Sequence, residues 1–267
     1  MNRLRIGMPS LIELNSFKDT VDLCRELNLN FIELNMNLPS NFIENLSCNE
    51  LLKVKENHKI FYTMHMPDDM DMGVFFPSVR DGYVKLALDT VVWAQKAGVE
   101  LLNFHIIEGA KMTLPQKKIF IYEQYSDIFV RNFKDSFKMV CQSAIKGKIG
   151  INIENSGNFN RLFAQEALNH VLAMKGTGIT WDIGHDSANS FIDHEYLMQM
   201  NHRITHMHFH DTKGQKDHLV PFDGELDLVD RIDFAIKKNI TVLLEVKTMA
   251  ALKESVYILR QRNLIPS

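Results

Sequence analysis

The chain has 267 residues, of which 45% are hydrophobic and 24% are charged, as expected for a globular protein with a sizeable core. Its 30 basic and 33 acidic residues give a net charge of −3, so no global field attracts nucleic acid or an anionic membrane surface. No run approaches the roughly 18 apolar residues that a transmembrane helix needs. The three cysteines, Cys24, Cys48 and Cys141, are widely spaced and odd in number, which favours a reduced, cytoplasmic protein.

Short apolar runs alternate with longer segments of helical spacing eight times along the chain. The predicted strands cover residues 4–8, 31–36, 59–66, 101–107, 149–154, 178–182, 204–210 and 241–246. The predicted helices cover residues 17–27, 48–57, 79–97, 116–145, 162–174, 194–200, 225–238 and 249–261, with a charged loop over 213–224. No Gly/Ser-rich or Pro-rich linker interrupts this order.

Eight strand–helix units in about 250 residues are what a closed (β/α)₈ barrel requires. We therefore predict an α/β fold, a single TIM barrel domain over residues 1–267. An open, doubly wound sheet is the alternative fold. It would normally show a glycine-rich turn after the first strand, and the segment from Gly7 to Ser10 is not such a turn.

The strand over residues 204–210 has a row of histidines on one face. His206, His208 and His210 occupy alternate positions, and side chains at alternate positions of a strand point the same way. A lone histidine on an apolar face is usually a satisfied core residue. A row of three that ends in Asp211 instead indicates a polar cavity, with a metal ion as one explanation.

The other predicted strands bring matching groups to the same place. When the apolar positions of each strand are assigned to the helix-facing side, seven strands keep an ionisable residue on the inner side: Glu33, His65, His105, Glu154, Asp182, His208 and Glu245. Barrel enzymes keep their chemistry at the C-terminal ends of the strands. Four carboxylates without an inward Lys or Arg would repel one another, and a divalent cation resolves this. Asp, Glu and His suit Mn²⁺, Zn²⁺, Mg²⁺ or Co²⁺.

Four motifs at the ends of the last four predicted strands carry a family resemblance. They are Ile153-Glu-Asn155, Trp181-Asp-Ile-Gly-His185, His206-Met-His-Phe-His-Asp211 and Leu244-Glu-Val246. In this order, the chain resembles the xylose-isomerase-like TIM barrel superfamily. That superfamily includes sugar and sugar-phosphate isomerases and epimerases, inosose-processing enzymes and endonuclease IV.

The resemblance implies a metal-dependent isomerase or epimerase of a sugar, sugar phosphate or inosose. One divalent ion would be held by Glu154, Asp182, His208 and Glu245, and the two glutamates would act as the acid/base pair through a cis-enediolate. The residues expected to bind substrate are Glu33, His65, His105, His185, Lys213 and His218. The expected partner is a small molecule, and a homo-oligomer is compatible with such families.

Two alternative functions stay open at this point. An abasic-site endonuclease would use additional metals at His65, His105, His185 and His218. The acidic balance opposes it, as does Lys216, which stands where the nuclease has an aspartate, with Asp217 shifted by one. The other alternative is a catalytically inactive barrel that only binds a sugar.

Overall fold

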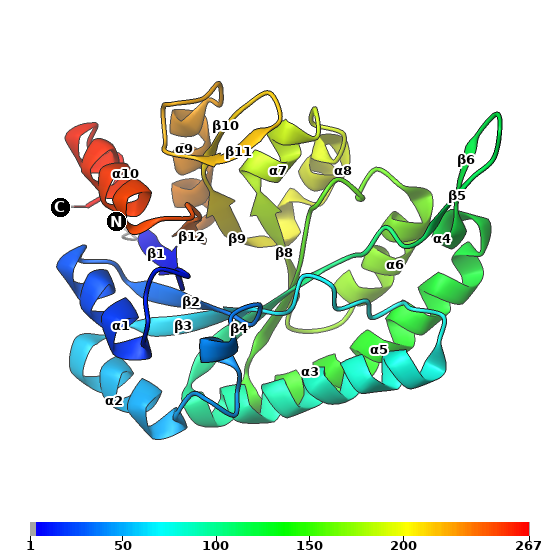
Figure 1. Cartoon of the computed structure of the whole chain (residues 1–267), viewed down its shortest axis with the longest axis horizontal. Helices are drawn as coiled ribbons and strands as arrows, with labels where there is room; N and C mark the ends of the chain where they lie inside the picture. The colour runs from blue at the N-terminus through cyan, green and yellow to red at the C-terminus, as the bar shows by residue number, and fades with distance from the viewer. Residues whose placement is uncertain (1–3, 267) are drawn as a thin grey trace.

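The computed structural model describes residues 4–266, in which eight parallel strands close into a barrel (Figure 1). Around the barrel the strands follow the order β1 (Arg5–Pro9), β12 (Thr241–Leu244), β9 (Ile204–Phe209), β8 (Thr177–Asp182), β7 (Gly150–Glu154), β4 (Val99–His105), β3 (Phe61–His65) and β2 (Phe31–Asn35). β2 pairs with β1, which closes the cylinder. This confirms the predicted (β/α)₈ barrel.

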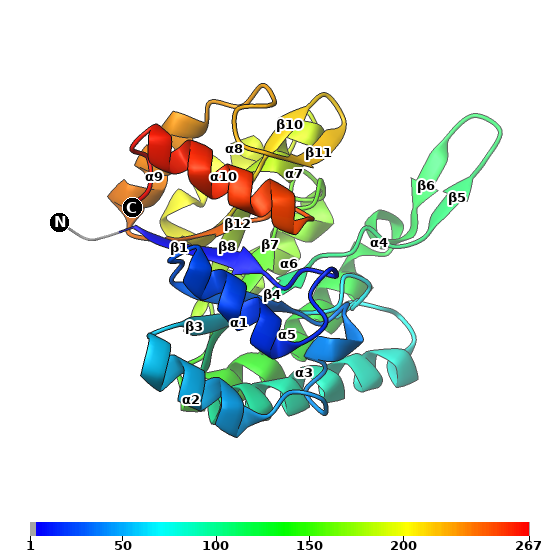
Figure 2. The ribbon, with the colours of Figure 1, turned by 60° about the vertical axis from the view of Figure 1, so that its left-hand side comes forward.

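A helix follows each barrel strand and packs on the outside of the cylinder (Figures 1 and 2). In chain order these helices are α1 (Phe17–Glu26), α2 (Cys48–His58), α3 (Pro77–Ala97), α5 (Ser126–Gly147), α6 (Leu162–Leu172), α8 (His194–Gln199), α9 (Leu228–Lys238) and α10 (Met249–Gln261). Shorter helical segments are η1 (Pro39–Asn41), α4 (Ile121–Gln124), α7 (Ile183–Ala188) and η2 (Asn201–Arg203). Within residues 4–266, none of the helices is both long and apolar enough to cross a bilayer.

Local sequence explains where several of these helices begin and end. Ser16 caps α1 and Thr248 caps α10, each by accepting a hydrogen bond from the backbone N–H three residues later. Gly98 ends α3 with a φ of 75°, a left-handed conformation that costs glycine little. These capping residues lie at or close to the helix ends that the spacing of apolar residues predicts.

Two β-hairpins were not predicted from the sequence. β5 (Lys111–Thr113) pairs with β6 (Lys118–Phe120), so the prediction of a helix over 116–145 is wrong at its start. This hairpin projects away from the barrel in both views (Figures 1 and 2). At its base, the Arg161 guanidinium stacks on the Phe120 ring, 3.8 Å from its centroid, a contact between residues distant in sequence. The second hairpin, β10 (Asp211–Lys213) with β11 (Lys216–Leu219), overlaps the start of the segment predicted as a charged loop.

The barrel separates apolar from polar side chains as strand alternation requires. Ile32 and Leu34 of β2 are fully buried in the layer between strands and helices, together with Tyr62 and Met64 of β3. The alternate positions carry polar groups that are also buried, such as Glu33, which is only 2% exposed. The fold thus gathers ionisable groups inside the cylinder, where each needs a hydrogen-bond or charge partner to offset its burial.

Candidate metal centre

Four side chains from neighbouring strands meet at the C-terminal end of the barrel. Glu154 ends β7, Asp182 ends β8, His208 lies in β9, and Glu245 directly follows β12. Asp182 and His208 are register partners, and Glu245 donates its backbone N–H to Phe209 O. One potential ligand atom from each of the four lies within 4.8 Å of all the others. The family resemblance had implied these four as a set.

The distances within this group fit a shared cation. His208 Nδ1 lies 3.2 Å from Glu154 Oε1, 2.9 Å from Glu245 Oε2 and 3.8 Å from Asp182 Oδ2. His208 Nδ1 and Glu245 Oε2 are nevertheless buried without a well-aligned hydrogen bond. Ligands on one ion at about 2.2 Å can be at most about 4.4 Å apart, a spread close to the one observed. Unpartnered nitrogen and oxygen atoms at these separations are what a divalent ion would satisfy.

The electrostatics of the protein without metal keep the two glutamates in the form that binds a cation. Burial alone would raise the pKa of Glu154, but the His208, His105 and His65 rings lower it well below its usual value. Burial would also raise the pKa of Glu245, but His208 lowers it, and the net result is a pKa well below the usual value. Burial opposes protonation of His208, whereas Glu154, Glu33 and Glu245 raise its pKa well above the usual value. The two glutamates are thus ionised, and a cation would have to displace a proton from His208.

Asp182 is held by contacts that the sequence did not suggest. Its backbone N–H donates to Asn155 Oδ1 at 2.8 Å, and Asn155 Nδ2 donates back to Asp182 O at 2.9 Å. Its carboxylate accepts the backbone N–H of His185 at 2.6 Å as the N-cap of α7, and Oδ1 lies 3.0 Å from His210 Nε2. Asn155 directly follows Glu154 and belongs to a motif that the sequence analysis identified. Its two hydrogen bonds to the backbone of the neighbouring strand could not be predicted from the sequence.

His65 and His105 stand on the other side of Glu154. His65 Nε2 lies 3.0 Å from His105 Nε2 and 3.4 Å from Glu154 Oε2, which is 3.6 Å from His105 Nε2. Asn103 donates a short hydrogen bond to the same glutamate oxygen. Burial opposes the proton on His65, but Glu154 raises the pKa of His65 to about 9. His65, His105 and Asp68 form a second group with the spacing of metal ligands.

A third group forms beside α7 despite the one-residue shift seen in the sequence. Asp217 Oδ2 lies 3.5 Å from His185 Nε2 and 3.9 Å from His218 Nε2, and the three residues have metal-ligand spacing. His218 adopts a φ of 54°, a left-handed conformation in β11. Asp217 Oδ1 is also 3.0 Å from His210 Nδ1. The shifted aspartate therefore still reaches both histidines, a contact that the sequence had left in doubt.

Two residues expected to bind substrate lie elsewhere. Glu33 is in the middle of β2, where its carboxylate contacts Thr63, His206 and His208 inside the barrel. Lys213 is exposed on the β10–β11 hairpin. Among residues 4–266, the only Lys or Arg that pairs with the four central residues is Lys247, whose Nζ is 2.9 Å from Glu245 Oε1.

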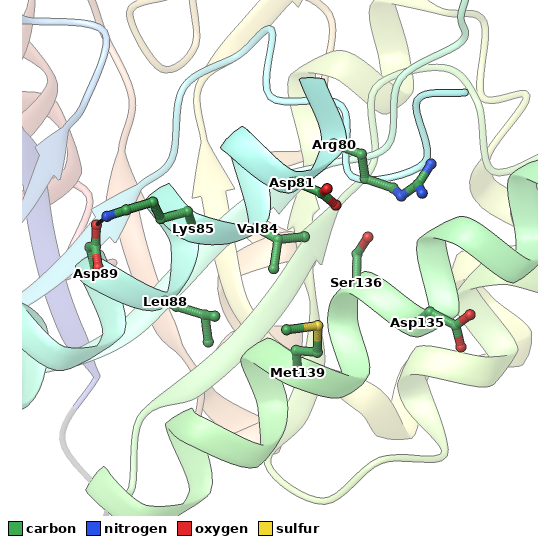
Figure 3. A pocket seen from close by; sticks show the side chains of 9 residues that line it. All are labelled: Arg80, Asp81, Val84, Lys85, Leu88, Asp89, Asp135, Ser136 and Met139. Carbon is green, nitrogen blue, oxygen red and sulfur yellow. Dashed lines mark hydrogen bonds and ion pairs between the residues drawn. The ribbon is translucent and has the colours of Figure 1, made fainter. Parts of the chain in front are cut away.

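A surface cavity of about 450 Å³ lies between α3 and α5, away from these groups (Figure 3). Its walls carry charges of both signs, and Lys85 is paired there with Asp89 at 2.5 Å. None of the clustered histidines lines it. This cavity is therefore separate from the candidate metal ligands at the end of the barrel.

Comparison with known proteins identifies structures with the same fold. The chain matches solved structures of a D-tagatose 3-epimerase-like protein (TM-score 0.79, 20% identity, 97% of this chain and 96% of that chain) and of 3-keto-D-glucoside 4-epimerase YcjR from E. coli (0.77, 16%, 97% and 100%). It also matches IOLI protein with a bound zinc atom (0.76, 14%, 98% and 97%). These identities establish similarity of fold. A search of curated proteins finds no significant match. Residues 21–262 match the family model described as xylose isomerase-like TIM barrel, and the chain belongs to that family.

Proposed function

We propose that this protein is a divalent-metal-dependent isomerase or epimerase of a sugar, sugar phosphate or inosose. The observation that carries the proposal is the convergence of Glu154, Asp182, His208 and Glu245 within 4.8 Å. A divalent ion there would act as a Lewis acid on a carbonyl and its adjacent hydroxyl. One structural relative is a 3-keto-D-glucoside 4-epimerase, another is a D-tagatose 3-epimerase-like protein and a third holds a zinc atom, which supports the proposal.

The two glutamates are the acid/base pair of the proposed reaction. They come from β7 and from the residue after β12, strands that β8 and β9 separate, so they approach the site from different walls. One ionised glutamate would remove the proton from the carbon beside the carbonyl. The other would take up a proton from a substrate hydroxyl or from water and pass it to the adjacent carbon or to the opposite face. Asn103 orients Glu154, and Lys247 orients Glu245.

The test is exchange of the substrate proton with solvent. Ketoses, inososes and their phosphates are incubated in D₂O with the protein and Mn²⁺, Zn²⁺, Mg²⁺ or Co²⁺, and deuterium incorporation is followed by NMR. Glu154→Gln and Glu245→Gln should each slow exchange by about 10²–10⁴-fold. Glu254→Gln, an exposed change on α10, is the matched control. Undiminished exchange in both active-site variants would refute the acid/base assignment.

The abasic-site endonuclease stays a second candidate because Asp217 lies beside His185 and His218. Three groups with metal-ligand spacing are then neighbours: the four central residues, the group of His65 and the group of His185. Glu154 of the central group contacts both His65 and His185. A nuclease should contain about three metal ions per chain by elemental analysis and cleave an abasic duplex. An inactive sugar-binding barrel would show neither activity, but a sugar would still raise its melting temperature.

A further inference from the structure

Glu33 is a carboxylate buried deep in the barrel with no Lys or Arg beside it among the described residues. It lies in the middle of β2 and is 2% exposed. Thr63 Oγ1 donates to its Oε2 at 2.7 Å, and His206 Nε2 lies 3.4 Å from the same oxygen. Its other oxygen, Oε1, is 3.0 Å from His208 Nε2. An ionised carboxylate at such a depth costs several kcal/mol unless its partners offset it, so packing alone does not explain it.

The two nitrogens of His208 face opposite neighbours. Nδ1 faces Glu154 and Glu245, at 3.2 and 2.9 Å, whereas Nε2 faces Glu33. An imidazole can offer a lone pair at Nδ1 only when its proton is on Nε2 or absent. That proton needs an acceptor, and Glu33 Oε1 is the carboxylate oxygen on this side of the ring.

We propose that Glu33 is a positioning residue of the metal centre, which keeps the His208 proton on Nε2 so that Nδ1 is free for the cation. The inference rests on the metal site of the proposed function, but not on its sugar chemistry. Carboxylates behind metal-bound histidines typically orient the ring and strengthen the ligand, and their loss weakens binding about 10–100-fold. The assignment replaces the expectation that Glu33 binds substrate.

The contact is close in distance but not fully aligned. His208 Nε2 and His206 Nε2 both lack a well-aligned hydrogen bond, although Glu33 is the nearest carboxylate to each. Glu33, His206 and His208 could themselves hold an ion, because they also have metal-ligand spacing. Two observations favour the hydrogen-bonded role. Thr63 donates to Glu33, and His206 Nδ1 is engaged with Thr241 Oγ1 at 2.5 Å.

The experiment measures Zn²⁺ affinity by competition with a chromophoric chelator, together with Zn²⁺ stoichiometry and the melting temperature of the metal-free protein. Glu33→Gln should raise the dissociation constant about 10–100-fold at unchanged stoichiometry. Its metal-free melting temperature should stay near that of the wild type, because the change also removes one charge from an excess of carboxylates. Thr63→Val is the matched control, since it removes a donor to Glu33 and leaves the Glu33–His208 contact in place.

The outcomes separate this inference from the proposed function. Glu154→Gln serves as the reference, and unchanged Zn²⁺ affinity in that variant would overturn the metal site itself. A Glu154→Gln loss with wild-type affinity in Glu33→Gln would overturn only the role of Glu33. Loss of a whole metal equivalent in Glu33→Gln would make Glu33 a ligand and would also overturn it. If Glu33→Gln does not fold, Glu33→Asp should weaken binding in the same direction, and wild-type affinity there would contradict the inference.

Discussion

Gly184 shows how closely the end of the barrel is packed around the candidate site. It lies in α7, directly against the ring of His210. A Cβ at this position would lie 1.8 Å from His210 Cε1 and 2.3 Å from its Nδ1. The ring cannot turn aside freely, because Nε2 is 3.0 Å from Asp182 Oδ1 and Nδ1 is 3.0 Å from Asp217 Oδ1. Gly184→Ala must therefore displace either α7 or the ring that contacts Asp182.

The expected magnitude follows from two opposing effects. Overpacking typically costs about 1–3 kcal/mol, and an overlap this severe belongs near ~3 kcal/mol. Alanine in place of glycine in a helix returns at most ~1 kcal/mol. The net loss is about 2 kcal/mol, which for a chain of this size lowers the melting temperature by about 4–8 °C. Because Asp182 is among the displaced contacts, Zn²⁺ affinity should fall as well.

Circular-dichroism melting of the chelator-treated protein measures the first effect, and chelator competition measures the second. Gly82→Ala is the matched control, because a Cβ there meets nothing within 4 Å on the exposed side of α3. That variant should melt about 2–4 °C higher, from a gain of ~1 kcal/mol in helix stability. A Gly184→Ala protein with the melting temperature and Zn²⁺ affinity of the wild type would refute the packing argument.

Two further predictions test the surroundings of the site. Burial raises the pKa of the Cys24 and Cys141 thiols to about 12, so in native protein at pH 8 a thiol reagent should modify the half-buried Cys48 first, and three equally fast thiols would contradict the buried placement. Burial opposes ionisation of Asp217, but His210 lowers the pKa of that carboxyl to about 2 in the protein without metal. A lowered carboxyl pKa stabilises the fold above about pH 3.9, and this contribution is lost as the pH falls to about 2. After treatment with a chelator, the wild type should melt at a higher temperature than Asp217→Asn, and this difference should shrink between pH 4 and pH 2. A difference that stays constant would count against the His210 contact.

Alternation along the strands explains why the inward direction of the four central residues could be predicted from sequence, whereas the family resemblance selected them as a set. Glu154, Asp182, His208 and Glu245 each follow or separate apolar residues that face the helices, so their inward direction is fixed by a period of two. Alternation gives the face of a strand but not the height along the barrel axis. The stagger of the strands sets that height, so Glu33 could not be placed behind His208 before the register was known.

The contacts that escaped prediction have no periodic signal. β5 and β6 have three residues each and are mostly exposed, so no apolar alternation marks them. Asp182 is both the N-cap that precedes α7 and a candidate ligand, and the glycine and serine within α7 are typical of a loop. Asp217 reaches His185 through a hairpin in which His218 has a positive φ. Each of these contacts depends on chain geometry that appears only after the barrel closes.

The burial of charge is the strongest physical reason to regard this barrel as built around a cation. Glu33, Glu154 and Asp182 are each no more than 2% exposed. A buried ion carries an effective penalty of several kcal/mol, so three of them would cost roughly ten kcal/mol without compensation. The entire net stability of a folded domain is only about 5–15 kcal/mol. In the protein without metal, protonated histidines compensate part of this charge, because the neighbouring carboxylates raise the pKa values of His65 and His208. A divalent ion bound by the same nitrogen and oxygen atoms would supply this compensation without requiring the histidines to hold extra protons, which is why the buried charges favour the proposed metal site.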